Sequence, residues 1–433
     1  MHRSVARAIA LALLLAAPPH AGGAQATATP AARSAAATRL GFSVERLGRI
    51  DRFLQGYVDD GAIAGAVALV LRDGRVVYEK AVGWSDVEAK RPMTADAIFR
   101  IASQTKALTS VAVMMLMEEG KLSLGDPVSR FIPEYAKTTV ATKVDTGVAI
   151  VAAKRAITIR DLLTHTAGIS YGTEAHVAPA YEAKGLGPAA GWGWYTADKD
   201  EAVCTTMERL ASLPFVAQPG EEFVYGYATD ILGCVVERAS KTTLDMFIRT
   251  RITEPLGMRD THFFVPREKG GRLVTVYASG EAGRVARAPD GARGQGHYAQ
   301  GPQRSFAGGA GLVSTARDYA RFLQMLLNGG ELDGVRLLAP KTVALMTTNA
   351  VGTRFSTDGL GFGLGFMTVE RFGANGLSSE GAYGWGGAYG SGYGVDPHDR
   401  LVYAFMINQL PNRANVGAMF PTMVYQALTG AAR

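Results

Sequence analysis

The sequence is poor in the residues that hold metal ions. Only two of its 433 residues are cysteines, Cys204 and Cys234, and its seven histidines are scattered along the chain. No cysteine or histidine stands at the spacing of a metal-ligand motif, so we expect neither a metal nor another cofactor. The two cysteines could form one disulfide in an oxidising compartment, but we favour two buried, reduced side chains.

Long apolar runs are missing once the N-terminus is passed. The run from Ala8 to Ala17 follows a basic start and precedes two prolines and Ala24-Gln25-Ala26, a pattern typical of a secretory signal peptide. It is about half the roughly 20 residues that a membrane-spanning helix needs. We therefore expect residues 1–26 to be a signal peptide, residues 27–40 to be a linker, and the protein to be periplasmic or secreted, with no integral membrane segment after cleavage.

The sequence also lacks a dense basic stripe. The net charge is +6, and two of the positive charges, Arg3 and Arg7, belong to the predicted signal peptide. The remaining Lys and Arg residues are dispersed, which argues against nucleic acid as a partner. With 47% hydrophobic and 19% charged residues, the chain is expected to be globular with a sizeable core, and nothing in it indicates an oligomeric state.

Apolar periodicity predicts a sheet built by both chain ends and a mostly helical middle. A helix is expected over Val44–Val58, followed by two strands, Ala66–Leu71 and Val76–Val82, that form a hairpin across Asp73-Gly74. A long buried helix is expected over Ile101–Glu119. Further helices are predicted at Thr158–Leu163, Asp200–Ser212, Thr229–Ser240, Ala316–Asn328 and Met419–Leu428, and further strands at Tyr393–Val395 and Leu401–Ile407.

The tetrapeptide Ser103-Gln104-Thr105-Lys106 opens the long helix. Residues three apart on a helix share one face, so the lysine amine can reach the serine hydroxyl. A serine hydroxyl becomes a good nucleophile only when a base accepts its proton, and a lysine in a dry pocket can assist. An amphipathic helix produces the same spacing by chance, so the tetrapeptide alone is a weak indication of catalysis.

The context of this tetrapeptide resembles the class C β-lactamase and serine esterase superfamily, which includes penicillin-binding proteins. In that superfamily S-x-x-K is the first catalytic motif. The resemblance runs from about Gly41 to the end, and it implies an α/β (α+β) fold: an antiparallel sheet with flanking helices from about 41–110 and 305–433, and a helical part from about 111–304. It rests on Ile98–Lys106, Gly120–Val128, Asp161–Gly168, Pro219–Gly220, Tyr225–Gly233, Gly308–Thr315 and Trp385–Pro397.

The second motif of the superfamily resembles Tyr225-Gly226-Tyr227. By this resemblance Tyr225 is the proton carrier, and the neighbouring ammonium of Lys106 favours its phenolate form. Tyr227 stands where relatives have Asn, and we expect it to contact the substrate. Its presence departs from the β-lactamase pattern.

The third motif of β-lactamases, K-T-G, is absent. Trp385-Gly386-Gly387 stands in its place and resembles the W-G-G form of family VIII carboxylesterases. Here the glycines let a substrate approach the strand closely, and Trp385 supplies an apolar wall. The resemblance further implies that the backbone N–H groups of Ser103 and Ala388 form the oxyanion hole.

A competing motif, Gly168-Ile169-Ser170-Tyr171-Gly172, matches the G-x-S-x-G nucleophile elbow of α/β-hydrolases. That elbow needs a preceding buried strand, whereas a helix is predicted there, so we interpret Ser170 as a turn residue. His165, just before this motif, is interpreted as a structural histidine because it stands alone beside a turn.

The function we predict is a serine hydrolase that forms an acyl-enzyme, most simply a carboxylesterase acting on small or short-acyl esters. A β-lactamase or a D-alanyl carboxypeptidase or aminopeptidase is the enzymatic alternative, disfavoured by the missing K-T-G and Asn. The alternative of another class is a non-catalytic ligand-binding or sensor domain of the same fold, against which the presence of Ser103, Lys106 and Tyr225 argues.

Overall fold

The computed structural model describes residues 30–145, 147–191, 196–280, 283–289, 296 and 298–430. The predicted signal peptide, residues 1–26, lies outside the described residues. Within the described part of the chain, no helix combines the length and apolar character needed to cross a membrane.

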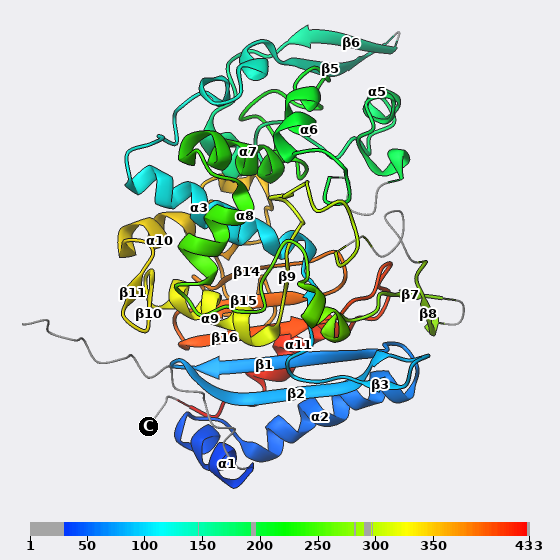
Figure 1. The fold of residues 1–433 in the computed structure, drawn as a ribbon. Coiled ribbons are helices and arrows are strands. Elements are labelled where there is room, and N and C mark those ends of the chain that lie inside the picture. The colour runs from blue at the N-terminus through cyan, green and yellow to red at the C-terminus, as the bar shows by residue number, and fades with distance from the viewer. Residues whose placement is uncertain are drawn as a thin grey trace, which may run out of the picture.

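The fold is built on an eight-stranded antiparallel sheet with the strand order β12-β13-β14-β15-β16-β1-β2-β3 (Figure 1). The predicted hairpin is present as β1 and β2, and the C-terminal strand β16 pairs with β1, so that both chain ends build the sheet as expected. The strands are β1 (Gly65–Arg72), β2 (Arg75–Asp86), β3 (Arg91–Pro92), β12 (Leu360–Phe362), β13 (Met367–Val369), β14 (Tyr383–Gly386), β15 (Gly392–Asp396) and β16 (Leu401–Met406).

Helices cover both faces of this sheet. Along β1, the odd-numbered residues Val67 to Leu71 pack into one core with α3 and α9, and the even-numbered residues Ala66 to Val70 pack into a second core with α2 and α11. Burial on both faces explains why β1 is a continuous apolar run. These helices are α2 (Val44–Asp59), α3 (Thr105–Glu118), α9 (Ala316–Leu327) and α11 (Val416–Tyr425).

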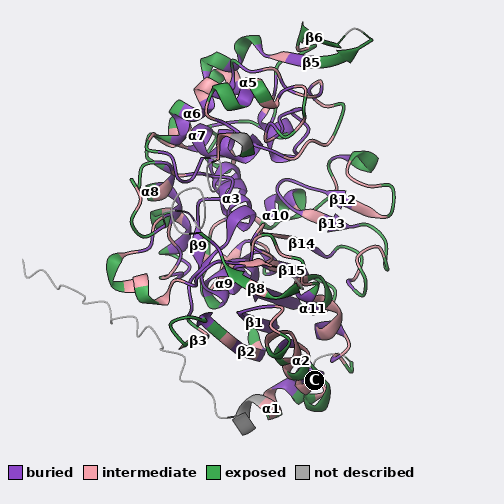
Figure 2. Ribbon diagram, turned by 90° about the vertical axis from the view of Figure 1, so that its right-hand side faces the viewer, coloured by how far each residue is buried: buried purple, intermediate pink, exposed green. Residues whose placement is uncertain are grey.

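A helical region lies beyond α3, at the end of the molecule opposite α1 and α2 (Figure 1). Figure 2 shows α3 buried between this region and the sheet. The α+β class is therefore confirmed, and the predicted helices are present with small shifts at their ends. The remaining helices are α1 (Pro30–Arg39), α4 (Ile159–Leu163), α5 (Ala178–Ala183), α6 (Val203–Leu210), α7 (Ala228–Ser240), α8 (Leu244–Ile248) and α10 (Pro340–Met346).

The middle of the chain also holds strands that the sequence analysis missed. A hairpin of β5 and β6 projects from the helical region, with exposed apolar side chains along β6. β6 has no buried residue, and β5 is buried only at Val140 and Ala141, so neither strand shows a clear alternation of apolar and polar residues. The small two-stranded pairs are β5 (Thr139–Val144) with β6 (Gly147–Ala152), β7 (Tyr277–Ser279) with β8 (Val285–Arg287), β10 (Glu331–Leu332) with β11 (Val335–Arg336), and β4 (Phe99–Arg100) with β9 (Val313–Ser314).

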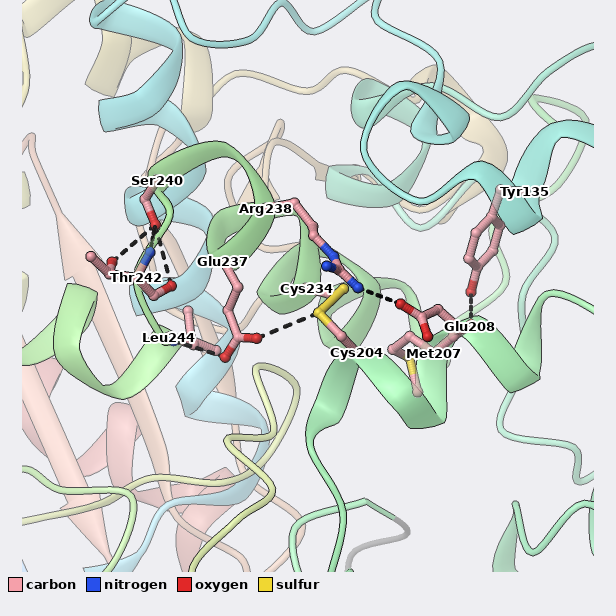
Figure 3. Close-up of a disulfide and its surroundings, with 10 residues drawn as sticks. All are labelled: Tyr135, Cys204, Met207, Glu208, Cys234, Glu237, Arg238, Ser240, Thr242 and Leu244. Carbon is pink, nitrogen blue, oxygen red and sulfur yellow. Dashed lines mark hydrogen bonds and ion pairs between the residues drawn. A yellow bond between two sulfur atoms is a disulfide. The ribbon is translucent and has the colours of Figure 1, made fainter.

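The two cysteines form a disulfide, which corrects the prediction of reduced side chains. Cys204 on α6 and Cys234 on α7 have α-carbons 4.9 Å apart, and Figure 3 shows the bond joining the two helices. Each cysteine lies on the buried side of its helix, so packing of α6 against α7 brings the sulfur atoms together. Such bonds persist in oxidising compartments.

Candidate active site

Ser103 lies where the sheet meets the helical region. It belongs to a short 3₁₀ turn, Ala102–Gln104, that leads directly into α3. The preceding residue, Ala102, has φ = 44°, a left-handed conformation that non-glycine residues rarely adopt. Such local strain is concentrated at functional sites, and here it sharpens the turn that carries the serine.

Lys106 holds the polar centre of the site together. Its Nζ atom donates to the Ser103 hydroxyl at 3.2 Å, to the Tyr171 hydroxyl at 3.0 Å and to the Gly309 carbonyl at 2.7 Å. An ammonium has three donors, so these contacts use its full capacity. Because the residue is only 3% exposed, the contacts fix the amine beside Ser103, at the spacing that the sequence predicts.

A buried carboxyl group, Asp230 on α7, supports this centre from behind. Its Oδ1 atom accepts from the Gly309 backbone N–H at 3.2 Å and from the Thr196 hydroxyl at 3.0 Å. A side chain at position 309 would overlap Oδ2, so glycine is required there. Burial raises the pKa of Asp230, and the nearby Lys106 ammonium opposes that rise. Asp230 thus holds Gly309 by its N–H, and the carbonyl of the same residue accepts from Lys106.

The ring of Tyr225 faces Lys106, and its hydroxyl group faces Trp385. The Lys106 Nζ atom lies 4.8 Å from the Tyr225 ring centroid, and the Trp385 indole N–H donates to the Tyr225 hydroxyl at 3.0 Å. An indole N–H can only donate, so the phenol oxygen acts as an acceptor in this contact. The structure therefore brings Tyr225, Lys106 and Trp385 together, as the motif order implied.

The segment after β14 passes close to the nucleophile turn. A side chain on Gly387 would overlap the Ile101 carbonyl oxygen, so this close approach requires glycine. The next residue, Ala388, packs against a small cluster that contains Ala102. These contacts bring the strand end that holds Gly386, Gly387 and Ala388 beside the turn that holds Ser103, where an oxyanion hole would need to be.

Tyr227, predicted to contact the substrate, does not reach the surface of the site. The residue is 0% exposed, and its hydroxyl accepts from the Gly187 backbone N–H at 2.8 Å. Its ring packs edge-on against Tyr171 at 5.0 Å between centroids. Tyr227 therefore supports Tyr171 from within the core, and we withdraw the prediction of a direct substrate contact.

The contacts of Ser170 and His165 are compatible with their interpretation as structural residues. The Ser170 hydroxyl accepts from the Gly172 backbone N–H and donates to Glu174 at 2.6 Å, and helix α4, not a strand, precedes it. His165 is buried behind Tyr225, with ring centroids 4.6 Å apart. Burial and the Lys106 charge hold the pKa of His165 well below its usual range, so this ring is neutral.

Sequence reasoning missed Tyr171 and the support from Asp230. Tyr171 lies in the loop after α4, and only the tertiary fold brings its hydroxyl to Lys106. The signal available was its place in the G-x-S-x-G match, which drew attention to Ser170 instead. Asp230 and Gly309 both fall in segments that carry the family resemblance, but the resemblance assigned neither a role.

Comparisons with known proteins give a consistent result. A family model described as Beta-lactamase matches residues 50–425. Protein Rv1367c of Mycobacterium tuberculosis is 36% identical, over 82% of this chain and 88% of that protein. Esterase EstB of Burkholderia gladioli is 33% identical, over 80% of this chain and 86% of that protein. The solved structure of EstCE1, described as a hydrolase with promiscuous acyltransferase activity, superposes with a TM-score of 0.73 at 28% identity and covers 89% of this chain and 99% of its own.

Proposed function

This chain belongs to the Beta-lactamase family and is a serine hydrolase, and on that premise we propose that it hydrolyses carboxylic esters with small or short acyl groups. In this proposal Ser103 is the nucleophile, Lys106 and Tyr225 handle its proton, and the backbone N–H groups of Ser103 and Ala388 form the oxyanion hole. The name of the relative EstB, an esterase, supports the choice of substrate class.

The mechanism we propose has two halves. Tyr225, which acts as the phenolate beside the Lys106 ammonium, accepts the Ser103 proton and becomes a neutral phenol while the serine oxygen attacks the ester carbonyl. The oxyanion hole stabilises the negative charge of the tetrahedral intermediate. When the intermediate collapses, Tyr225 returns the proton to the departing alcohol and an acyl-enzyme remains. Water then attacks the acyl group by the same route and releases the acid.

One observation carries the preference for esters over β-lactams. The residue in the position of the K-T-G lysine is Trp385, whose indole N–H is engaged with the Tyr225 hydroxyl at 3.0 Å. A lysine in that position would offer a cation to a substrate carboxylate, whereas an indole offers an apolar surface and one neutral donor. An uncharged ester fits this surface better than an anionic β-lactam or peptide.

The test compares two substrates on the purified enzyme. We expect turnover of p-nitrophenyl acetate that disappears in Ser103→Ala, and slow turnover of a chromogenic cephalosporin. Dominant cephalosporin turnover, or release of D-alanine from a D-Ala-D-Ala peptide, would favour the β-lactamase or carboxypeptidase alternative. If a fluorophosphonate probe labelled wild type no better than Ser103→Ala, the non-catalytic alternative would replace the proposal.

We further propose export, with residues 1–26 as signal peptide, followed by one hydrolase domain with a helical part over about 111–304. The linker expected at residues 27–40 is not kept in this proposal, because Pro30–Arg39 form α1, and Ala37 and Leu40 are buried in the core beside α2. The disulfide between Cys204 and Cys234 supports an oxidising destination. Expression with the natural N-terminus in a Gram-negative host should yield a periplasmic or secreted protein that begins at Thr27. A cytoplasmic protein with an uncleaved N-terminus would contradict this proposal.

A further inference from the structure

Five aromatic side chains form a continuous surface that starts at Tyr225. Successive ring centroids lie 5.5 Å apart for Tyr225 and Trp385, 5.4 Å for Trp385 and Phe362, 5.0 Å for Phe362 and Phe223, and 4.9 Å for Phe223 and Phe355. Phe355 also returns to Trp385 at 6.2 Å. We call these five residues the aromatic wall.

The aromatic wall is buried at its back and partly exposed at its front. Phe362 is 1% exposed, whereas Phe223, Tyr225, Phe355 and Trp385 are each partly exposed. Two edge-to-face contacts, Trp385 with Phe362 and Phe223 with Phe355, and tilted contacts between the other pairs hold the rings in place, since aromatic pairs favour such arrangements at these centroid distances. Four partly exposed rings, joined to the serine site through Tyr225, are therefore available to a ligand.

The wall is also uncharged. His165 packs behind it, 5.8 Å from the Phe223 ring and 5.6 Å from the Phe362 ring, and its depressed pKa keeps it neutral. The nearby cation, Lys106, lies at the Tyr225 end of the wall, 4.8 Å from that ring centroid, and its three donors are used by Ser103, Tyr171 and the Gly309 carbonyl. A flat, neutral, apolar group is the natural occupant of such a surface.

The position of Tyr225 decides which part of an ester meets the wall. If Tyr225 returns the proton to the leaving alcohol, the alcohol oxygen must come within about 2.6–3.2 Å of its hydroxyl. That hydroxyl is already bonded to Trp385, so the group attached to the alcohol oxygen emerges next to Trp385. The acyl group, attached to the carbonyl carbon at Ser103, lies on the opposite side of the reacting bond.

We propose that the aromatic wall binds the alcohol portion of the ester, and that the preferred alcohol is an uncharged aromatic one of the benzyl type. The proposal rests on the ester hydrolysis proposed above. Phe355 is its most informative member, because it contacts both Phe223 and Trp385 but does not contact the polar centre around Lys106.

The experiment measures kcat/KM for two pairs of esters, each corrected for its rate of hydrolysis by hydroxide. Benzyl acetate against ethyl acetate varies the alcohol, and ethyl phenylacetate against ethyl acetate varies the acyl group. We expect wild type to prefer benzyl acetate by at least about 10-fold, since one or two aromatic contacts supply about that factor. In Phe355→Ala that preference should fall by about 10-fold, and the ratio for the acyl pair should stay the same.

The matched control is Phe372→Ala, which removes a phenylalanine that is 63% exposed and lies outside the wall; both ratios should match those of wild type. If Phe355→Ala does not fold, Phe355→Leu keeps most of the volume and is held to the same criterion. An unchanged benzyl preference in the folded Phe355 variant, or a change confined to the acyl pair, would overturn the proposal.

Failure of the proposed function gives a different result. If wild type hydrolyses no ester at all, the wall is tested by binding alone, with saturation-transfer NMR of benzyl alcohol against ethanol. Binding of benzyl alcohol that is lost in Phe355→Ala would support the wall as a site for aromatic groups. Absence of binding to wild type would overturn it.

Discussion

On the Lys106 side of the active site the groups are polar and joined by hydrogen bonds, whereas on the Trp385 side they are aromatic rings in contact with one another. The polar side contains a lysine whose three donors are all used, backed by a buried carboxyl group. The aromatic side contains partly exposed rings and a neutral histidine. Tyr225 joins them, because its ring faces Lys106 and its hydroxyl binds Trp385.

This comparison separates two roles. Hydrogen bonds with fixed distances determine how the serine is activated, because proton transfer requires specific atoms in reach of one another. Ring contacts determine shape and polarity, so they act on which substrate is accepted. Changes on the polar side should therefore lower kcat for every substrate, and changes on the aromatic side should alter the ranking of substrates.

The largest effect should follow loss of the lysine amine. Lys106→Met keeps the length of the side chain but leaves Ser103 without its amine partner, and we expect kcat to fall by roughly 10³-fold for every ester. Steady-state assays with p-nitrophenyl acetate and with benzyl acetate measure the decrease in kcat for each ester. A decrease that differed strongly between the two esters would break the division of roles.

Removing the hydroxyl of Tyr225 should lower kcat more than removing the hydroxyl of Tyr171. Tyr225→Phe removes the proposed proton carrier and should lower kcat by about 10²- to 10³-fold, whereas Tyr171→Phe removes one hydrogen bond to the ammonium and should cost about 10- to 100-fold. Steady-state kinetics of the two variants side by side test the assignment. A larger loss in Tyr171→Phe would identify Tyr171, and not Tyr225, as the proton carrier.

The bond between the two sides should have a smaller effect. Trp385→Phe keeps an aromatic ring but removes the N–H that donates to the Tyr225 hydroxyl, and loss of one neutral hydrogen bond predicts a decrease in kcat of about 5- to 10-fold. The preference for benzyl over ethyl acetate should survive, because a ring remains. Loss of that preference with unchanged kcat would mean that the indole N–H does not act on Tyr225.

The smallest expected effect is the contribution of His165 to the pH dependence of the free energy of unfolding. Its pKa is depressed in the folded protein, so below the ordinary value of 6.5 only the unfolded chain takes up the proton, and stability is lost as the pH falls. His165→Asn suits the left-handed backbone at this position, where φ is 54°, and removes the titration. Between about pH 7.5 and pH 5.5, the free energy of unfolding of wild type should fall by about 1.4 kcal/mol more than that of the variant.

Urea unfolding of both proteins at the two pH values supplies that difference. Equal decreases in wild type and His165→Asn would show that His165 takes up a proton in the folded state, and the aromatic side would then not be neutral.

The part of the site that the sequence predicts is the part encoded locally. Ser103 and Lys106 are three residues apart at the start of a helix, so their proximity follows from helix geometry. Tyr225 and Trp385 were placed by resemblance to a family, not by geometry. The fold was predictable for a related reason: β1, β2 and α3 have strong apolar patterns that local physics specifies.

The remainder depends on tertiary packing. Phe223 and Phe355 lie more than a hundred residues apart in the sequence, and Phe355 and Trp385 belong to a turn and a strand. Nothing in the spacing of these three residues shows that their rings touch. The partnership of Cys204 with Cys234 likewise became visible only once α6 and α7 were packed together. Tyr227 shows the opposite error, because a residue that occupies a motif position was taken to share the function of that position, whereas it is buried.

The most direct test of the central claim is identification of the acylated residue. Wild type quenched during turnover of p-nitrophenyl acetate should gain one acetyl group by intact mass, and peptide mapping should locate it on Ser103. Ser103→Ala should gain none, and Ser170→Ala, which removes the competing motif serine, should still be acetylated. An acetyl group on Ser170, or turnover by Ser103→Ala at the wild-type rate, would contradict the account.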